Sequence, residues 1–268
     1  MFYFKRISIF LSAFVFLFFL PCAQAQNTNL ELAPLLNIDP VTLQNPETGE
    51  YFEALLVTHH KFNDNLPHEQ GIVLSVGIYD YPPEYPQTFL EEFRTWLPLI
   101  TDYLTRQPQG AVMVPDSEFN GALRAGALAA CAEYLTNPAQ GIDIEYLGLI
   151  LGSLGSRGGL FFLEHPERYP STTSVIAASF ASPREFAEVD LAEENIAQIT
   201  ASIGIYVGVK TVDRQSNIDA HALHDAITAH NSQYDPDITE KIEEYENGRH
   251  GFYKSYKDSP VGRDGEAA

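Results

Sequence analysis

Short apolar runs alternate with longer segments of helical periodicity along most of this chain. Every second residue from Ile203 to Val209 is apolar, which predicts a strand with one buried face. Between Phe89 and Arg106 the apolar residues recur mostly at intervals of three or four, which predicts an amphipathic helix. The predicted strands are Tyr51–Thr58, Gly71–Val76, Ala111–Val114, Ile144–Leu151, Val175–Ser179, Ile203–Val209 and Lys241–Tyr245. The predicted helices are Phe89–Arg106, Gly121–Leu135, Gly155–Glu164, most of Arg184–Ile199, and Asp219–His230.

This alternation of strands and helices predicts an α/β fold with a mainly parallel sheet and helices on both faces. No internal repeat or long linker divides the chain, so we expect one domain over residues 51–256. Residues 26–50 are polar and rich in proline and asparagine, and we interpret them as an N-terminal arm that wraps the domain. Residues 257–268 are interpreted as a flexible C-terminal tail.

The first residues predict an export signal. Lys5 and Arg6 precede an almost unbroken apolar run, and Ala23–Ala25 gives the small-x-small pattern of a cleavage site. The run covers only the 14 residues Ile7–Leu20, whereas a membrane-spanning helix needs roughly 20. We therefore expect cleavage after Ala25 and a periplasmic or secreted protein with no membrane anchor.

Removal of this signal leaves a strongly acidic chain. The full sequence has 16 basic and 36 acidic residues, and loss of Lys5 and Arg6 leaves 14 against 36, a formal net charge of −22. Such a field repels polyanions, which excludes nucleic acids and anionic membranes as expected partners. Cys131 becomes the sole cysteine, so no intrachain disulfide can form and stability must come from a hydrophobic core.

The strongest chemical signal is an apolar strand that runs directly into serine and glycine, in the segment 146–159 (YLGLILGSLGSRGG). A sharp strand-to-helix turn strains the backbone of a serine and raises its hydroxyl above the sheet. Ser153 is favoured for this role, because the residues that follow it form a helical stripe whose first half is small. Ser156 is the alternative nucleophile. A phosphate-binding loop is disfavoured, because no lysine follows at the required spacing.

A serine nucleophile needs a histidine base and an acid that orients the histidine. In a strand–turn–helix hydrolase the chain order is serine, acid, histidine. His250 follows the last predicted strand on a glycine-rich turn, and Asp213 follows the strand that ends at Val209. Asp219 is the alternative acid, although it could instead cap the following helix.

Stabilisation of the developing oxyanion requires backbone N–H groups aimed at it. The amide of Leu154 is the first candidate, and Gly77 or Ile78, after the strand Gly71–Val76, offers the second. His221 and His224 have a spacing seen in metal sites, but no third ligand is evident, and a solvated helix face is the expected explanation. No metal or organic cofactor is required.

Four stretches of the chain resemble the α/β-hydrolase superfamily, and within it the dienelactone-hydrolase-like branch. They are the elbow-like Ser153–Arg157, Glu164–Arg168, Val114–Ser117, and Tyr245–Phe252 (YENGRHGF), which is similar to the branch's motif around the catalytic histidine. The likeness spans about residues 52 to 256. It implies that Ser153 is the nucleophile, Asp213 the acid and His250 the base.

Three positions differ from the pattern of that branch. Leu151 stands two residues before the nucleophile, where a small residue is usual, and Ser75 replaces a histidine that usually follows the third strand. The branch also typically uses cysteine where this chain has Ser153.

We therefore expect an exported serine hydrolase that cleaves a small carboxylic ester or a related acyl bond through an acyl-serine intermediate. One alternative is a catalytically inactive hydrolase fold that binds a ligand or a partner, and it is motivated by Leu151 and by the altered oxyanion loop after the strand Gly71–Val76. The other is a periplasmic solute-binding protein, a class that usually has two similar lobes.

Overall fold

The computed structural model describes residues 35–63, 66, 68–76, 89–116, 121–139, 142–184, 186, 190–208, 214–234 and 238–245. The strands are β1 (Leu36–Gln44), β2 (Tyr51–His59), β3 (His68–Val76), β4 (Ala111–Pro115), β5 (Ile144–Gly152), β6 (Val175–Ala181), β7 (Ser202–Gly208) and β8 (Glu240–Tyr245). The helices are α2 (Phe89–Arg106), α3 (Gly121–Thr136), α4 (Gly155–Glu164), α5 (Glu193–Ile196) and α6 (Arg214–Asn231), with a 3-10 turn at Pro170–Ser174.

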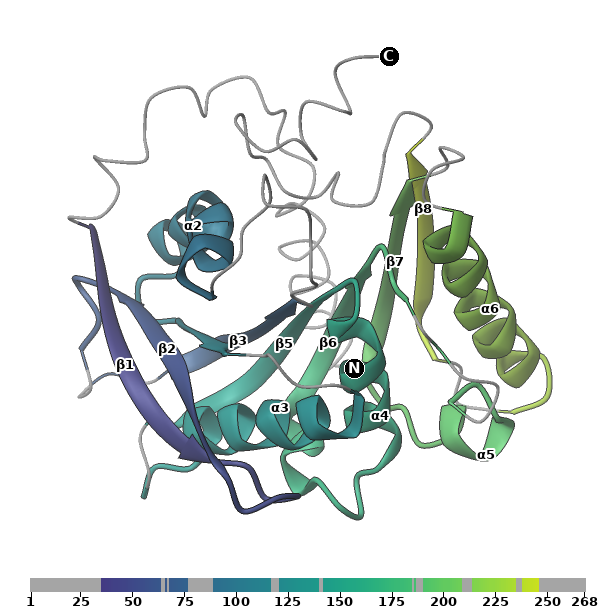
Figure 1. Ribbon diagram of the computed structural model, residues 1–268, viewed down its shortest axis with the longest axis horizontal. Helices are drawn as coiled ribbons and strands as arrows, with labels where there is room; N and C mark the ends of the chain where they lie inside the picture. The colour runs from purple at the N-terminus through teal and green to yellow at the C-terminus, as the bar shows by residue number, and fades with distance from the viewer. Residues whose placement is uncertain are drawn as a thin grey trace.

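The eight strands form one twisted sheet in the order β1-β2-β4-β3-β5-β6-β7-β8 (Figure 1). β2 runs antiparallel to both β1 and β4, and all the other neighbours are parallel. The predicted α/β class with a mainly parallel sheet is therefore confirmed. The described strands belong to a single sheet, whereas a solute-binding protein would usually have two similar lobes.

Helices cover both faces of this sheet, as predicted (Figure 1). On one face α2 buries an apolar stripe that includes Phe93, Trp96 and Ile100. On the other face α3 and α4 pack over β3 and β5, α6 packs over β7 and β8, and the alanine-rich α3 allows close contact. Parallel strands buried on both sides need apolar residues at nearly every position, which explains the continuous apolar run of β5.

β1 is a strand that was not predicted, and it lies within residues 26–50, which we interpreted as an arm that wraps the domain. β1 pairs with β2 over nine residues, from Leu36 opposite His59 to Gln44 opposite Tyr51. Only Leu36 and Leu43 are buried in β1, because it is an edge strand with an open outer side. Its polar composition therefore hid its periodicity.

The predicted helix over Arg184–Ile199 is wrong for most of its described length. Among the described residues of this stretch only α5, Glu193–Ile196, is helical, and residues 184, 186 and 190–192 are not. Two side chains of the segment serve as tertiary anchors instead: Arg184 donates to Ser216, and Asp190 pairs with Arg157. These contacts with α6 and α4 hold the backbone in an irregular path.

Residues 1–34 and 246–268 lie outside the described residues, so the signal peptide and the tail remain predictions. Within the part of the chain that the structure describes, no helix has the length and apolar character needed to cross a membrane. Cys131 is buried in α3, where burial raises the pKa of its thiol.

Candidate active site

The backbone turns sharply at Ser153, between the end of β5 and the start of α4. Ser153 has a φ of +53°, and among the described non-glycine residues only Ser182 shares a positive φ. A left-handed conformation costs an L-residue roughly 1–2 kcal/mol, and such strain persists where the surrounding structure imposes it. Here the Ser153 N–H donates to the carbonyl oxygen of Ala181 at 3.0 Å, which ties the bend to β6.

Gly155 allows α4 to approach the sheet at its first turn. A Cβ atom at this position would lie 2.3 Å from the carbonyl oxygen of Ser75, at the end of β3, and 2.8 Å from its carbonyl carbon. Real side chains do not approach backbone atoms so closely, so only glycine fits. The glycine two residues after Ser153 is therefore a steric requirement of this bend.

Replacement of Gly155 by alanine is expected to displace α4 and disturb the bend. The clash is with backbone, which cannot adopt another rotamer, so we expect a loss of about 3 kcal/mol in the free energy of unfolding. Urea denaturation followed by circular dichroism measures this loss. An alanine variant as stable as the wild type would show that α4 can move away from β3 at no cost.

Ser156, the alternative nucleophile, lies inside α4 and not at the bend. Its side chain is fully buried, and its Oγ donates to the carbonyl oxygen of Leu151 at 3.4 Å. Its amide donates to the Ser153 carbonyl oxygen at 3.1 Å, which closes the first turn of the helix. Of the two serines, only Ser153 has the strained conformation that the sequence predicts for a strand-to-helix turn.

The carboxyl ends of the central strands meet along one edge of the sheet. Val76 of β3, Gly152 of β5, Ala181 of β6 and Tyr206 of β7 form a single row of neighbours, and Gly208 pairs with Tyr245 at the end of β8. Ligands of parallel α/β proteins bind at this edge. Ser153 directly follows Gly152, the member of this row that ends β5.

Gly77, Asp213 and His250 lie outside the described residues. Each of them follows in sequence a strand that ends at this edge: β3 precedes Gly77, β7 precedes Asp213, and β8 precedes His250. The order serine, acid, histidine along the chain is thus compatible with strands that all end at this edge of the sheet.

Comparison with known proteins shows relatives in structure only. No protein-family model matches the chain, and no curated protein matches it significantly in sequence. Among solved structures, the esterase Est22 is similar with a TM-score of 0.60 at 11% identity, over 88% of this chain and 79% of that one. A thermostable esterase from Pseudomonas putida is similar with a TM-score of 0.55 at 12% identity, over 94% and 88%.

A dienelactone-hydrolase-like promiscuous phosphotriesterase from metagenomic libraries is also similar, with a TM-score of 0.54 at 11% identity, over 86% of this chain and 95% of that one. The chain has an α/β-hydrolase fold. The resemblance that the sequence motifs indicated is thereby confirmed at the level of the fold. Nucleophiles of this fold stand on a sharp strand-to-helix turn, and Ser153 occupies such a turn between β5 and α4.

Leu154, the predicted oxyanion donor, starts the helix of this hydrolase fold. It is the N-cap residue of α4, its backbone is helical, with φ −62° and ψ −24°, and its own side chain makes no capping hydrogen bond. Backbone N–H groups in the first turn of a helix have no intrahelical partner and carry a partial positive charge. The start of α4 is therefore suited to stabilise a negative oxygen beside Ser153.

Asp219, the alternative acid, does not cap a helix. The prediction that its helix starts at position 219 is wrong, because α6 begins at Arg214 and places Asp219 in the second turn. The carboxylate is buried and accepts a hydrogen bond from the Gln215 side chain at 2.8 Å, so it stabilises the helix through an (i, i+4) contact.

Ser182 is a strained residue at this edge that the sequence analysis missed. It follows β6 with a φ of +47° and is fully buried. Its N–H donates to the Tyr206 carbonyl oxygen at 2.8 Å, and its carbonyl oxygen accepts from the Ser216 hydroxyl at 3.3 Å. Arg184 in turn donates to that hydroxyl at 3.2 Å. The network joins β6, β7 and α6 beside the bend, and no local sequence signal pointed to it.

His221 and His224 face carboxylates of the edge strand β8. His221 Nε2 lies 2.9 Å from Glu244, and His224 Nδ1 lies 2.8 Å from Glu240. Among the residues that the structure describes, no group of three or more side chains could hold a metal ion. The pairs attach α6 to β8, which agrees with a structural role for this helix face.

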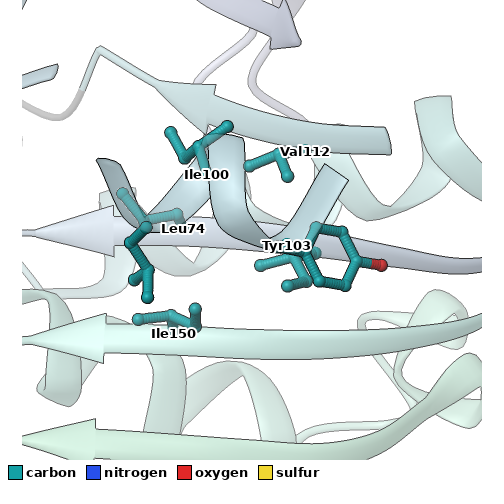
Figure 2. Close-up of a pocket in the computed structure, with 7 residues that line it drawn as sticks. Leu74, Ile100, Tyr103, Val112 and Ile150 are labelled. Carbon is teal, nitrogen blue, oxygen red and sulfur yellow. The ribbon is translucent and has the colours of Figure 1, made fainter. Parts of the chain in front are cut away.

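A small apolar pocket lies between α2 and the sheet (Figure 2). Leu74, Ile100, Val112 and Ile150 point into it beside the ring of Tyr103. The Tyr103 hydroxyl is the only polar side-chain group of this lining, and burial raises its pKa. The pocket is on the α2 face of the sheet, opposite α4, and it offers no group suited to catalysis. We interpret it as a packing gap.

Proposed function

We propose that this protein is an exported serine hydrolase that cleaves a carboxylic ester or a related acyl bond through an acyl-serine intermediate. The observation that carries the proposal is the strained Ser153, with φ +53°, between β5 and the amino end of α4. Esterases are among the proteins that share the fold, which supports the same reaction class. Export rests on the apolar segment and cleavage pattern in residues 7–25.

The mechanism assigns each step to a residue of this chain. His250 takes the proton of Ser153 as its oxygen attacks the acyl carbon, and Asp213 holds the imidazole in the required tautomer. The amides of Leu154 and Gly77 bind the oxyanion. The imidazolium then protonates the leaving alcohol. Water, deprotonated by His250, attacks the acyl carbon of the acyl-serine, and the imidazolium returns the proton to the Ser153 oxygen as the acid product leaves.

The composition restricts the substrate class. A net charge of −22 after signal removal repels polyanions and anionic membrane surfaces, so the proposed substrate is a small ester-like molecule. The mechanism uses no metal and no organic cofactor, and no nucleic acid takes part.

A catalytically inactive hydrolase fold that binds a ligand is the second candidate. Leu151 and Ser75 favour it, because they replace a small residue and a histidine that the related enzymes usually have. The two proposals differ in whether Ser153 reacts with an electrophile.

A fluorophosphonate probe distinguishes them, because it forms a covalent bond only with an activated serine. The wild type is expected to be labelled, Ser153→Ala is expected to lose the label, and Ser156→Ala is expected to keep it. Peptide mass mapping locates the adduct. An unlabelled wild type would favour the binding protein, and loss of the label in Ser156→Ala alone would move the nucleophile to that position.

A further inference from the structure

Leu151 fills the space that a side chain at position 159 would need. A Cβ atom at Gly159 would lie 2.2 Å from Cδ1, 2.5 Å from Cδ2 and 2.8 Å from Cγ of Leu151. The Leu151 side chain itself is fully buried. The isopropyl group of Leu151 therefore packs directly on the Cα atom of Gly159.

This contact and the contact of Gly155 lie on one face of α4. Residues four apart are neighbours on a helix surface, so Gly155 and Gly159 both face the sheet. Gly155 rests on the backbone of Ser75 in β3, and one turn later Gly159 rests on the side chain of Leu151 in β5. Two contacts one turn apart determine both the distance of α4 from the sheet and its tilt.

The tilt of α4 is transmitted to Ser153 through short connections. Leu151 is two residues before Ser153, and its carbonyl oxygen accepts from Ser156 in the helix. The Ser156 amide in turn donates to the Ser153 carbonyl oxygen. A helix pushed outward at Gly159 would therefore pull on the bend, and a misplacement of about 1 Å can cost 10²-fold in rate.

We propose that Leu151 and Gly159 are a complementary pair of positioning residues, in which a large strand residue and a missing helix side chain together hold α4 so that the bend presents Ser153. This inference rests on the proposed function. It also gives a physical role to Leu151, which differs from the small residue usual at this position and so favoured an inactive protein. The space between β5 and α4 that a small residue at position 151 would leave is provided instead by the missing side chain at position 159.

The test is a double-mutant cycle with two readouts, urea denaturation and the rate of fluorophosphonate labelling. Gly159→Ala alone is expected to lower the urea midpoint and to slow labelling about 100-fold. In a Leu151→Ala background the same substitution is expected to raise the midpoint, because the new methyl group fills the space left by leucine. Labelling of Leu151→Ala/Gly159→Ala is expected to be at least tenfold faster than that of Gly159→Ala.

A matched control uses the neighbouring contact. Leu151→Ala is expected not to rescue Gly155→Ala, because the partner of Gly155 is backbone. If Gly159→Ala lowers the midpoint equally with leucine or alanine at position 151, or is labelled as fast as the wild type, the pairing is wrong while the proposed function stands. A wild type that is not labelled overturns the proposed function and, with it, the positioning role. If Gly159→Ala fails to fold, the double variant carries the test, and a double variant that also fails to fold overturns the pairing.

Discussion

Glycine at position 153 is expected to abolish hydrolysis and also to give a more stable protein than alanine at the same position. Both substitutions remove the proposed nucleophile, and loss of such a residue lowers kcat by roughly a factor of 10³ to 10⁶. They differ in the Cβ atom, and therefore in the free energy of a backbone with positive φ. At a φ of +53° alanine keeps the steric cost of its Cβ and glycine does not, so glycine is favoured by about 1 kcal/mol.

Ser156 provides the matched control, because it lies three residues away in the first turn of α4, where its φ is negative. There glycine is expected to be less stable than alanine by up to about 1 kcal/mol, the opposite order to that at position 153. Both Ser156 variants lose the same hydroxyl contact with Leu151, so the difference between their free energies of unfolding again reports the backbone preference alone. Urea denaturation of the four variants gives the two differences, and hydrolysis of a chromogenic ester gives the activities. The same order at both positions would contradict a functional strain at Ser153.

The bend itself was predictable from sequence because the residues that signal it are local. The apolar strand, the serine, the glycine two residues later and the helix follow one another within 144–164. Close packing of the helix start on the sheet demands a small residue there, and Gly155 supplies it against Ser75. The strain at Ser153 could be expected without knowledge of any distant contact.

Other parts of the site depend on contacts between distant segments. Ser182 adopts its positive φ beside partners on β7 and α6, at Tyr206 and Ser216, and nothing in its own neighbourhood of the sequence requires that conformation. The accommodation of Leu151 by Gly159 likewise becomes visible only when the helix is placed on the strand. β1 also could not be predicted locally. Its strand structure depends on pairing with β2, and its mostly polar sequence gives no sign of that pairing.

Position 164 is expected to control much of the pH dependence of stability. Glu164 is the last residue of α4, its side chain is buried, and among the residues that the structure describes neither of its carboxylate oxygens has a hydrogen-bond partner. Burial, and secondly the charge of Asp190, raise its pKa to about 9. Asp190 has Arg157 as an ion partner, with Nε 3.2 Å from Oδ2. A carboxylate at the carboxyl end of a helix is also disfavoured by the helix dipole.

The sign of the effect follows from the two pKa values. In the unfolded chain Glu164 titrates near its ordinary value of about 4.3, so between about pH 5 and pH 9 the folded protein binds a proton that the unfolded chain lacks. Its contribution to stability is therefore complete at acidic pH and declines as pH rises, by up to about 1.4 kcal/mol per pH unit. Glu164→Gln keeps the shape of the side chain, removes the titration and should remove this slope.

The measurement is urea denaturation of the wild type and Glu164→Gln at pH 5.5, 7 and 8.5. Other groups titrate in both proteins, so the difference between the two curves isolates position 164. We expect that difference to grow in favour of glutamine with each pH step. Glu167→Gln is the control, because that carboxylate is 63% exposed, hydrogen-bonded to His165 and has a lowered pKa, so its removal leaves the slope over this range in place. Parallel curves for the wild type and Glu164→Gln would mean that water or a cation reaches the carboxylate and that it is ionised in the folded protein.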